Sequence, residues 1–159
     1  MNELDRLVTE TFKQNSDTAQ IKDGMDLAFI RINYKKKEIE YAGAHRPLYY
    51  VPKGGELQEI KGDKWPIGGG KAYKNKTDFN TTLLNVNEGD TIYFFSDGFP
   101  DQFGGPDNRK YGGKRIKRVI GEINEKPLDM IHADFEREYH NWKGDVKQTD
   151  DILLFGIRF

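Results

Sequence analysis

Cysteine is absent from this chain of 159 residues. Its absence excludes disulfides, thiolate zinc sites, iron–sulfur clusters and a cysteine nucleophile, and it fits a reducing compartment. Histidine is scarce as well: the chain has only His45, His132 and His140. The last two are too far apart on a helix to chelate one ion, so we expect three ordinary surface histidines.

The chain also lacks a long apolar run and an excess of charge of one sign. No apolar stretch approaches the roughly 20 residues of a membrane span, and the N-terminal residues are polar and mixed in charge. Lys and Arg together number 25 and Asp and Glu 26, so there is no basic excess to hold a nucleic acid backbone. We therefore expect no nucleic acid partner, no membrane contact by this segment and a cytoplasmic location.

Aromatic residues and glycine are abundant instead, with 10 Phe, 8 Tyr and 17 Gly. Together with alternating apolar segments between turn residues, they indicate a β-rich domain. The order is one helix, a β-meander, two helices and a closing buried strand, which predicts an α+β fold with mostly antiparallel sheet. Asn2 and Asp5 could cap the first helix. The expected helices are 3–14, 116–123 and 128–142, and the expected strands are 27–32, 39–42, 48–51, 57–60, 79–86, 91–95 and 152–157.

Acidic residues adjoin two of the expected strands. Asp97 and Gly98 follow strand 91–95, and Asp150 and Asp151 precede the last strand. If these strands are antiparallel neighbours, Asp97 and Asp150 lie on one rim of the sheet, where a hard cation such as Mg²⁺ or Mn²⁺ would relieve their repulsion. Gly98 would leave room for backbone and water to come close. The simpler reading is that Asp97 begins a turn and Asp150 ends a loop.

A nucleophile is harder to find. Ser96 has no plausible histidine partner in the sequence, which gives a serine-nucleophile mechanism little support. The residues around Gly70 and Lys71 do not satisfy the Walker pattern.

Five segments, in order, resemble a known family. The chain is similar to the bacterial SpoIIE-type branch of the PPM (PP2C-like) protein serine/threonine phosphatases from about residue 21 to its end. Each segment alone is weakly specific, but five in one order at sensible spacing form a specific pattern. They are 23–26 (DGMD), 41–48 (YAGAHRPL), 61–68 (KGDKWPIG), 96–105 (SDGFPDQFGG) and 148–152 (QTDDI).

The resemblance implies an antiparallel β-sandwich flanked by helices. It also implies hydrolysis of phosphoserine or phosphothreonine by metal-activated water, with two Mn²⁺ or Mg²⁺ ions in a complete domain. Asp97 and Asp150 fall on the family's metal-binding aspartates, with Gly98 and Asp151 beside them as further site residues. This agrees with the residue-based reading, which found remote carboxylates and no nucleophile.

One departure matters. The family has an earlier Asp-x-x-Gly-His-Gly motif whose aspartate bridges the two metals, and these 159 residues contain no match. We therefore expect a single domain that is N-terminally incomplete, with residues 1–22 as a leading helix and linker and 23–159 as the family-like part. Alone it is expected to hold one ion weakly or none, and to be inactive. The alternative is a non-catalytic module that binds a phosphoprotein or a partner domain; a third reading is a small-ligand module built around Trp65 and its glycine loop.

The partners follow by analogy with the family. The substrate would be a phosphorylated regulatory protein of the anti-anti-sigma kind in the bacterial cytoplasm, with a sensor domain upstream in the parent protein. A sandwich without its first strands exposes sheet edges, and strand 27–32 is apolar at most positions. We therefore expect a homodimer or larger assembly with residues 3–32 in the interface.

Overall fold

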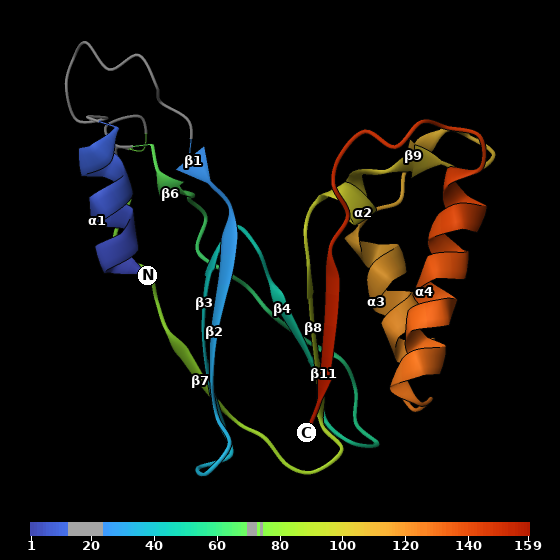
Figure 1. Ribbon diagram of the computed structural model, residues 1–159, viewed down its shortest axis with the longest axis horizontal. Helices are drawn as coiled ribbons and strands as arrows, with labels where there is room; N and C mark the ends of the chain where they lie inside the picture. The colour runs from blue at the N-terminus through green and yellow to red at the C-terminus, as the bar shows by residue number, and fades with distance from the viewer. Residues whose placement is uncertain (13–23, 70–72, 74) are drawn as a thin grey trace. The chain divides into compact units, whose positions relative to one another are not determined.

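The computed structural model describes residues 1–12, 24–69, 73 and 75–159 (Figure 1). By its contacts the chain forms two compact units. Unit 1 comprises Met1–Leu48 and Glu59–Val86, and unit 2 comprises Tyr49–Gln58 and Asn87–Phe159. The expected boundary at residue 22 and the family-like Asp23 lie outside the described residues. Among the helices of the described ranges, none is long and apolar enough to cross a membrane.

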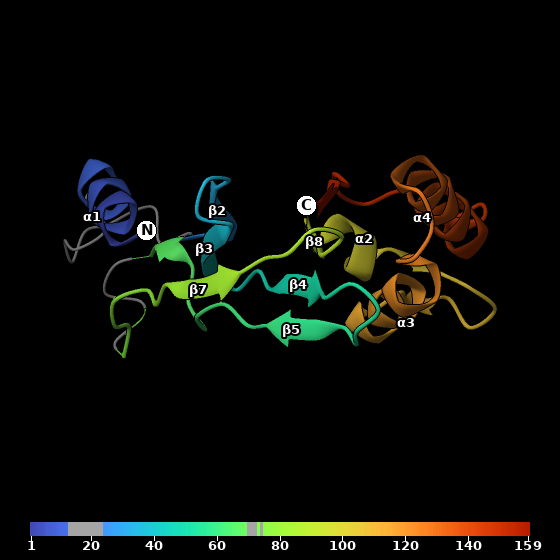
Figure 2. The same ribbon diagram turned by 90° about the horizontal axis from the view of Figure 1, so that it is seen from below.

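A four-stranded sheet carries unit 2. Its central strand β8 (Thr91–Phe95) pairs antiparallel with β11 (Leu154–Arg158) on one side and with β4 (Leu48–Val51) on the other. Beyond β4 lies β5 (Gln58–Ile60), which Figure 2 shows beside it. The order β11-β8-β4-β5 makes β11 an edge strand. The antiparallel pairing of the expected strands 91–95 and 152–157 is thus confirmed.

Two helices pack against one face of this sheet. Since side chains alternate between the faces of a strand, positions 49, 51, 93, 95 and 154 point to the same side, and all belong to or pack against the hydrophobic core that includes the helices. The helices are α3 (Gly113–Ile123) and α4 (Leu128–Lys143), which lie side by side in Figure 1. The fully or largely buried side chains of this core are Tyr49, Val51, Tyr93, Phe99, Tyr111, Ile116, Val119, Ile120, Ile123, Ile131 and Phe135.

A short connection leads from β8 to α3. It consists of α2 (Gly98–Asp101), β9 (Phe103–Gly104) and β10 (Arg109–Lys110), of which the last two pair with each other. Gly104 is required where this connection meets α4, because a Cβ atom there would lie 1.9 Å from the carbonyl oxygen of Trp142.

Unit 1 is built on a three-stranded antiparallel sheet. Its order is β2 (Leu27–Asn33), β3 (Glu38–Ala44), β7 (Thr82–Asn85). A separate antiparallel pair joins β1 (Gly24–Met25) to β6 (Ile67–Gly68), two short strands that were not among the expected ones. As an edge strand, β2 leaves Phe29 54% exposed. This exposure fits the expected assembly, which stays a prediction.

The first helix, α1 (Asn2–Thr11), is attached through the two residues that were expected to cap it. The capping prediction is wrong, since neither side chain caps the helix. Asn2 Oδ1 instead accepts the N–H of Phe79 at 2.6 Å, and Asp5 Oδ1 accepts the N–H of Gly68 at 2.6 Å and is paired with Lys76. The polar residues at the start of α1 therefore bind distant parts of the chain instead of the first backbone N–H groups of the helix.

Strand 79–86 is shorter than expected for a related reason. The N–H of Phe79 is taken by Asn2, and the N–H of Asn80 donates to the carboxylate of Asp63 at 2.8 Å. Backbone groups engaged by side chains cannot join the ladder. Pairing therefore begins at Thr82.

The last strand is not the buried strand that its apolar run predicts. It begins at Leu154 rather than Ile152, and Leu153 and Phe155 are 54% and 45% exposed. Because the helices cover one face of the sheet, Leu154 packs against the unit 2 core, while Phe155 on the opposite face stacks on Phe94 at 5.1 Å between ring centroids.

Asp90 forms buried hydrogen bonds at the end of the unit 2 sheet where β8 begins. Its side chain is 2% exposed and accepts hydrogen bonds from Tyr50 Oη at 2.7 Å, from the N–H of Lys53 at 2.9 Å and from the N–H of Asn87 at 2.8 Å. Burial alone would raise the pKa of this carboxyl, but the three donors outweigh it, so the pKa lies below its ordinary value. The ionised form therefore stabilises the folded chain.

We predict that Asp90→Asn lowers the free energy of unfolding by about 1–3 kcal/mol at neutral pH, because an amide cannot replace an acceptor that serves three donors. A carboxyl whose pKa is depressed on folding stabilises above its unfolded pKa, about 3.9, and the effect is lost as the pH falls through the folded value. The difference between variant and wild type should therefore shrink below about pH 4. Urea unfolding against pH measures it. Glu88→Gln, an exposed acid of the same turn, is the control and should change little; equal effects of both would contradict the assignment.

Candidate metal centre

The pairing of β8 with β11 brings the two predicted acidic segments together. Beyond the last paired residues, Phe95 and Leu154, the N–H of Ser96 donates to the carbonyl of Leu153 at 3.0 Å. Ser96 Oγ accepts the N–H of Leu153 at 3.0 Å and donates to the carbonyl of Asp151 at 2.9 Å. One serine therefore fixes the chain on both sides of Ile152 against the start of the Asp97 segment. The role of Ser96 as a bridging residue was not anticipated from the sequence.

Gly98 lets the two segments touch. A Cβ atom on Gly98 would lie 2.3 Å from the carbonyl oxygen of Asp151 and 2.9 Å from its carbon, so no other residue fits without a shift. The expected close approach of backbone is present, and the backbone is that of Asp151. Asp97 and Asp151 are thus held on adjoining segments at one end of the sheet.

Asp97 precedes the short helix α2, and its carbonyl accepts the N–H of Asp101 at 2.8 Å. Asp150 and Asp151 lie in the exposed loop before β11. Asp150 Oδ1 accepts the N–H of Asp151 at 2.7 Å, and its carbonyl accepts Gln148 Nε2 at 2.8 Å. The loop is therefore held by its own polar groups, with its carboxylates open to solvent.

The donor set suits a hard cation that keeps most of its water. Mg²⁺ is commonly bound through one or two carboxylates with water in the remaining positions, and the Asp97 and Asp150–Asp151 segments offer such carboxylates. Among the described residues, no group of three or more His, Asp or Glu side chains is arranged so that it could hold a metal ion. The residues thus fit a weakly held ion, and the metal role of Asp97, Gly98, Asp150 and Asp151 stays a prediction.

Gln102 is a positioning residue that sequence reasoning missed. Its side chain is fully buried, and Nε2 donates to the carbonyls of Phe103 at 2.9 Å and of Lys147 at 3.2 Å, while Oε1 accepts Tyr139 Oη at 3.2 Å. The hydrogen bond from Gln102 to the carbonyl of Lys147 connects the end of α2 to the loop that leads to Asp150. A buried glutamine has no sequence signature, because most glutamines are exposed.

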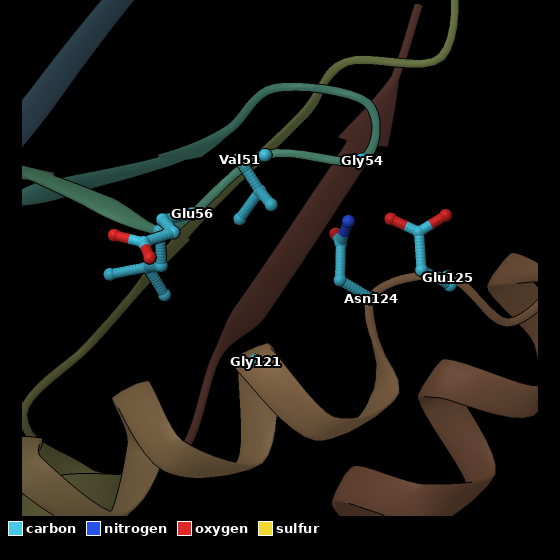
Figure 3. Close-up of a pocket in the computed structure, with 8 residues that line it drawn as sticks. Val51, Gly54, Glu56, Gly121, Asn124 and Glu125 are labelled. Atoms are coloured by element: carbon cyan, nitrogen blue, oxygen red, sulfur yellow. The ribbon is translucent and has the colours of Figure 1, made fainter.

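Two cavities lie elsewhere on the units. A cavity of about 400 Å³ in unit 2 lies between the turn after β4 and the end of α3, lined by Val51, Glu56 and Asn124 among others (Figure 3). A cavity of about 260 Å³ lies in unit 1. Neither is lined by the four predicted site residues or by Trp65, whose ring packs with Ala44, Ile67 and Phe79. The packing of Trp65 favours a structural role over a ligand platform.

Comparison with known protein families shows the family to which the chain belongs. The model of the family described as stage II sporulation protein E (SpoIIE) matches residues 1–159. No curated protein matches the chain.

Solved structures share the fold. The SiaA-PP2C domain of Pseudomonas aeruginosa superposes with a TM-score of 0.76 at 22% identity, over 99% of this chain and 67% of that one. The SpoIIE PP2C phosphatase domain of Bacillus subtilis, with a fragment of its regulatory domain, gives 0.65 at 17%, over 84% of this chain and 37% of that one. The RsbU and RsbW domains of Rv1364c from Mycobacterium tuberculosis give 0.64 at 18%, over 84% and 36%. The expected PP2C-type fold class is confirmed, and this chain spans about a third to two thirds of those structures.

We predict that Gly98→Ala destabilises the folded chain by about 1–3 kcal/mol, the usual cost of forcing atoms into a filled space, because its methyl group meets the Asp151 backbone. Gly121→Ala is the matched control. Gly121 lies within α3 with open space around it, so alanine there should stabilise the chain by about 0.5–1 kcal/mol. Thermal and urea unfolding of both variants test this. A Gly98→Ala chain as stable as wild type would show that the two acidic segments are not held in contact.

Proposed function

The chain belongs to the SpoIIE family of PP2C-like phosphatase domains, and from this premise we propose that it serves the hydrolysis of phosphoserine or phosphothreonine on a regulatory protein. The observation that carries the proposal is the contact of the Asp97 and Asp151 segments through Ser96 and Gly98. It brings together two segments with carboxylates that are more than fifty positions apart in the sequence.

The residues have separate tasks in this proposal. Asp97 and Asp150 hold the cation, with Asp151 beside them, and Gly98 and Ser96 set the spacing of the two segments. A bound Mn²⁺ or Mg²⁺ polarises a phosphoryl oxygen and lowers the pKa of water, so that no side-chain nucleophile is needed. This agrees with the hydrogen bonds of the Ser96 hydroxyl, which donates to the carbonyl of Asp151 and accepts the N–H of Leu153.

A second candidate function is a non-catalytic module that keeps the fold and binds a phosphoprotein or partner domain. It is favoured by one observation: the 159 residues contain no Asp-x-x-Gly-His-Gly motif. Without a bridging carboxylate, a second cation has little to hold it.

The partners are part of the proposal. The substrate class, a phosphorylated anti-anti-sigma-like protein in the bacterial cytoplasm, is taken from the family, with an upstream sensor domain in the parent protein. Two of the similar structures support this proposal by the domains that they contain. One contains a phosphatase domain and part of a regulatory domain, and the other contains RsbU and RsbW domains. Assembly into a homodimer or a larger assembly, with residues 3–32 in the interface, is proposed from the exposed edge strand β2.

We predict that the chain binds Mn²⁺ or Mg²⁺ in the millimolar range and that Asp97→Asn abolishes the binding, because the amide removes the charge that compensates dehydration of the ion. Isothermal titration calorimetry measures it. Asp107→Asn, an exposed acid of unit 2 that neighbours Arg109, is the control and should bind as wild type does. Absence of binding in the wild type, or equal binding in Asp97→Asn, would refute the metal centre.

We also predict negligible Mn²⁺-dependent hydrolysis of p-nitrophenyl phosphate by residues 1–159, since activation of water between two ions needs both to be held. Release of p-nitrophenol is followed at saturating Mn²⁺, with Asp97→Asn as the blank. Robust turnover that disappears in Asp97→Asn would show that these residues hold a complete catalytic centre and would reject the non-catalytic alternative.

A further inference from the structure

Three of the five family-like segments lie in unit 1, and the proposed function gives them no role. The structure brings the described parts of all three together: Asp26 before β2, the loop 43–46 that includes the end of β3, and residues 61–64. Their convergence on one loop calls for an explanation of its own.

The backbone of this loop is rigidly held. The N–H of Asp63 donates to the carbonyl of Gly43 at 2.7 Å, and the N–H of His45 donates to the carbonyl of Asp63 at 2.9 Å. A Cβ atom on Gly62 would lie 2.7 Å from the Gly43 carbonyl oxygen, so the two segments are in direct backbone contact. Tyr41 Oη donates to the carbonyl of Arg46 and closes the loop from the other side.

His45 takes a conformation that this loop imposes. Its φ is 57°, in the left-handed region that residues with a Cβ rarely occupy. Such strain costs about 1–3 kcal/mol and persists only where the surroundings fix it, most often at binding and active sites. The backbone conformation at His45 is therefore fixed by the hydrogen bonds of the surrounding loop.

The imidazole is also oriented. His45 Nδ1 lies 2.9 Å from Asp26 Oδ1, and Asp26 Oδ2 is paired with Arg46. Burial alone would raise the pKa of Asp26, but the bonds from Arg46 and His45 outweigh it, so the pKa falls below its ordinary value and the group is a carboxylate. Nδ1 then carries the hydrogen, and Nε2 is left for another partner. In the part of the chain that the structure describes, no hydrogen bond reaches Nε2.

His45 lines the unit 1 cavity of about 260 Å³ together with two lysines. Two acids also line it, but both are engaged: Asp63 binds the backbone N–H and the side-chain amide of Asn80 at 2.8 Å each, and Glu59 has an interaction of its own. Within the described residues, Lys61 and Lys64 form no ion pair with a carboxylate. The groups of the lining that remain uncommitted are the ammonium groups of Lys61 and Lys64 and the His45 Nε2 atom. The full lining is His45, Pro47, Glu59, Lys61, Gly62, Asp63 and Lys64.

We propose that this cavity binds a phosphate oxyanion, held by the ammonium groups of Lys61 and Lys64 and by the imidazolium form of His45, in which both Nδ1 and Nε2 carry a hydrogen. Two lysines disfavour a metal ion, and charge-assisted bonds to a compact oxyanion satisfy all three donors at once. The same chemistry is presented by inorganic phosphate and by a phosphoserine side chain. The site stands on unit 1 alone; only the choice of phosphoserine as a probe rests on the proposed function.

The three histidines of the chain make the test direct. Imidazole resonances are followed by NMR in EDTA while inorganic phosphate is added at constant pH and ionic strength, with sulfate-free chloride as the reference salt. We expect a saturable shift of the His45 signal alone. His132 and His140, exposed on α4 in unit 2, are internal controls. His45→Asn identifies the signal, since asparagine tolerates the left-handed conformation.

Charge variants locate the anion. Lys61→Gln and Lys64→Gln should each weaken phosphate binding about tenfold, as expected for loss of a charge-assisted bond. Lys114→Gln and Lys147→Gln, which change the net charge equally in unit 2, should leave it unaltered. Asp97→Asn should also leave it unaltered, so that failure of the metal centre and failure of this site give different results.

Titration with a phosphoserine peptide and its unphosphorylated form distinguishes the source. Binding of the phosphopeptide at least as tightly as phosphate assigns the cavity to a substrate side chain, and binding of phosphate alone assigns it to the released anion. A His45 signal that does not saturate, that shifts together with those of His132 and His140, or that responds equally in Lys61→Gln and Lys114→Gln would overturn the proposal and leave the Asp26–His45 pair as a purely structural clasp.

Discussion

The arrangement of unit 2 depends on the antiparallel pairing of β8 with β11. This pairing sets Ser96 opposite Leu153, and from there the double hydrogen bond of Ser96 and the missing side chain of Gly98 bring the Asp151 backbone against the start of α2. A slip of one residue would turn every side chain to the other face. It would also put Tyr93 and Leu154 out of the core shared with α3 and α4.

Buried polar groups, not apolar area alone, then fix the elements around this sheet. Gln102 joins α2 to the loop that carries Asp150, and Asp90 closes the turn at the other end of β8. Arg158 reaches from β11 to the carbonyls of Asn124 and Lys126, which follow the end of α3. Unsatisfied buried polar groups cost free energy, so these bonds select one arrangement from several that would bury similar apolar surface.

The family-like segments divide between the two units. Those of unit 2 supply the carboxylates of the candidate metal centre, while those of unit 1 build the loop that strains and orients His45. The glycines show how such segments work: Gly62 and Gly98 are both placed where a Cβ atom would collide with backbone. The positions of these glycines in the sequence therefore reflect tertiary contacts of the fold. For this reason the five short segments together indicated the family, although no single one was specific.

The sequence by itself determined the class and order of the longer elements, the two long helices of unit 2 and the position of Asp97 and Asp150 at the ends of two strands, because period and turn residues are local signals. That these two strands are neighbours was decided by the tertiary structure. Only the tertiary structure decided that Asn2 and Asp5 anchor α1 instead of capping it, that β11 is a half-exposed edge strand, and that Gln102 and His45 hold the loops. These outcomes depend on which distant backbone groups compete for each side chain, and no local pattern records that competition.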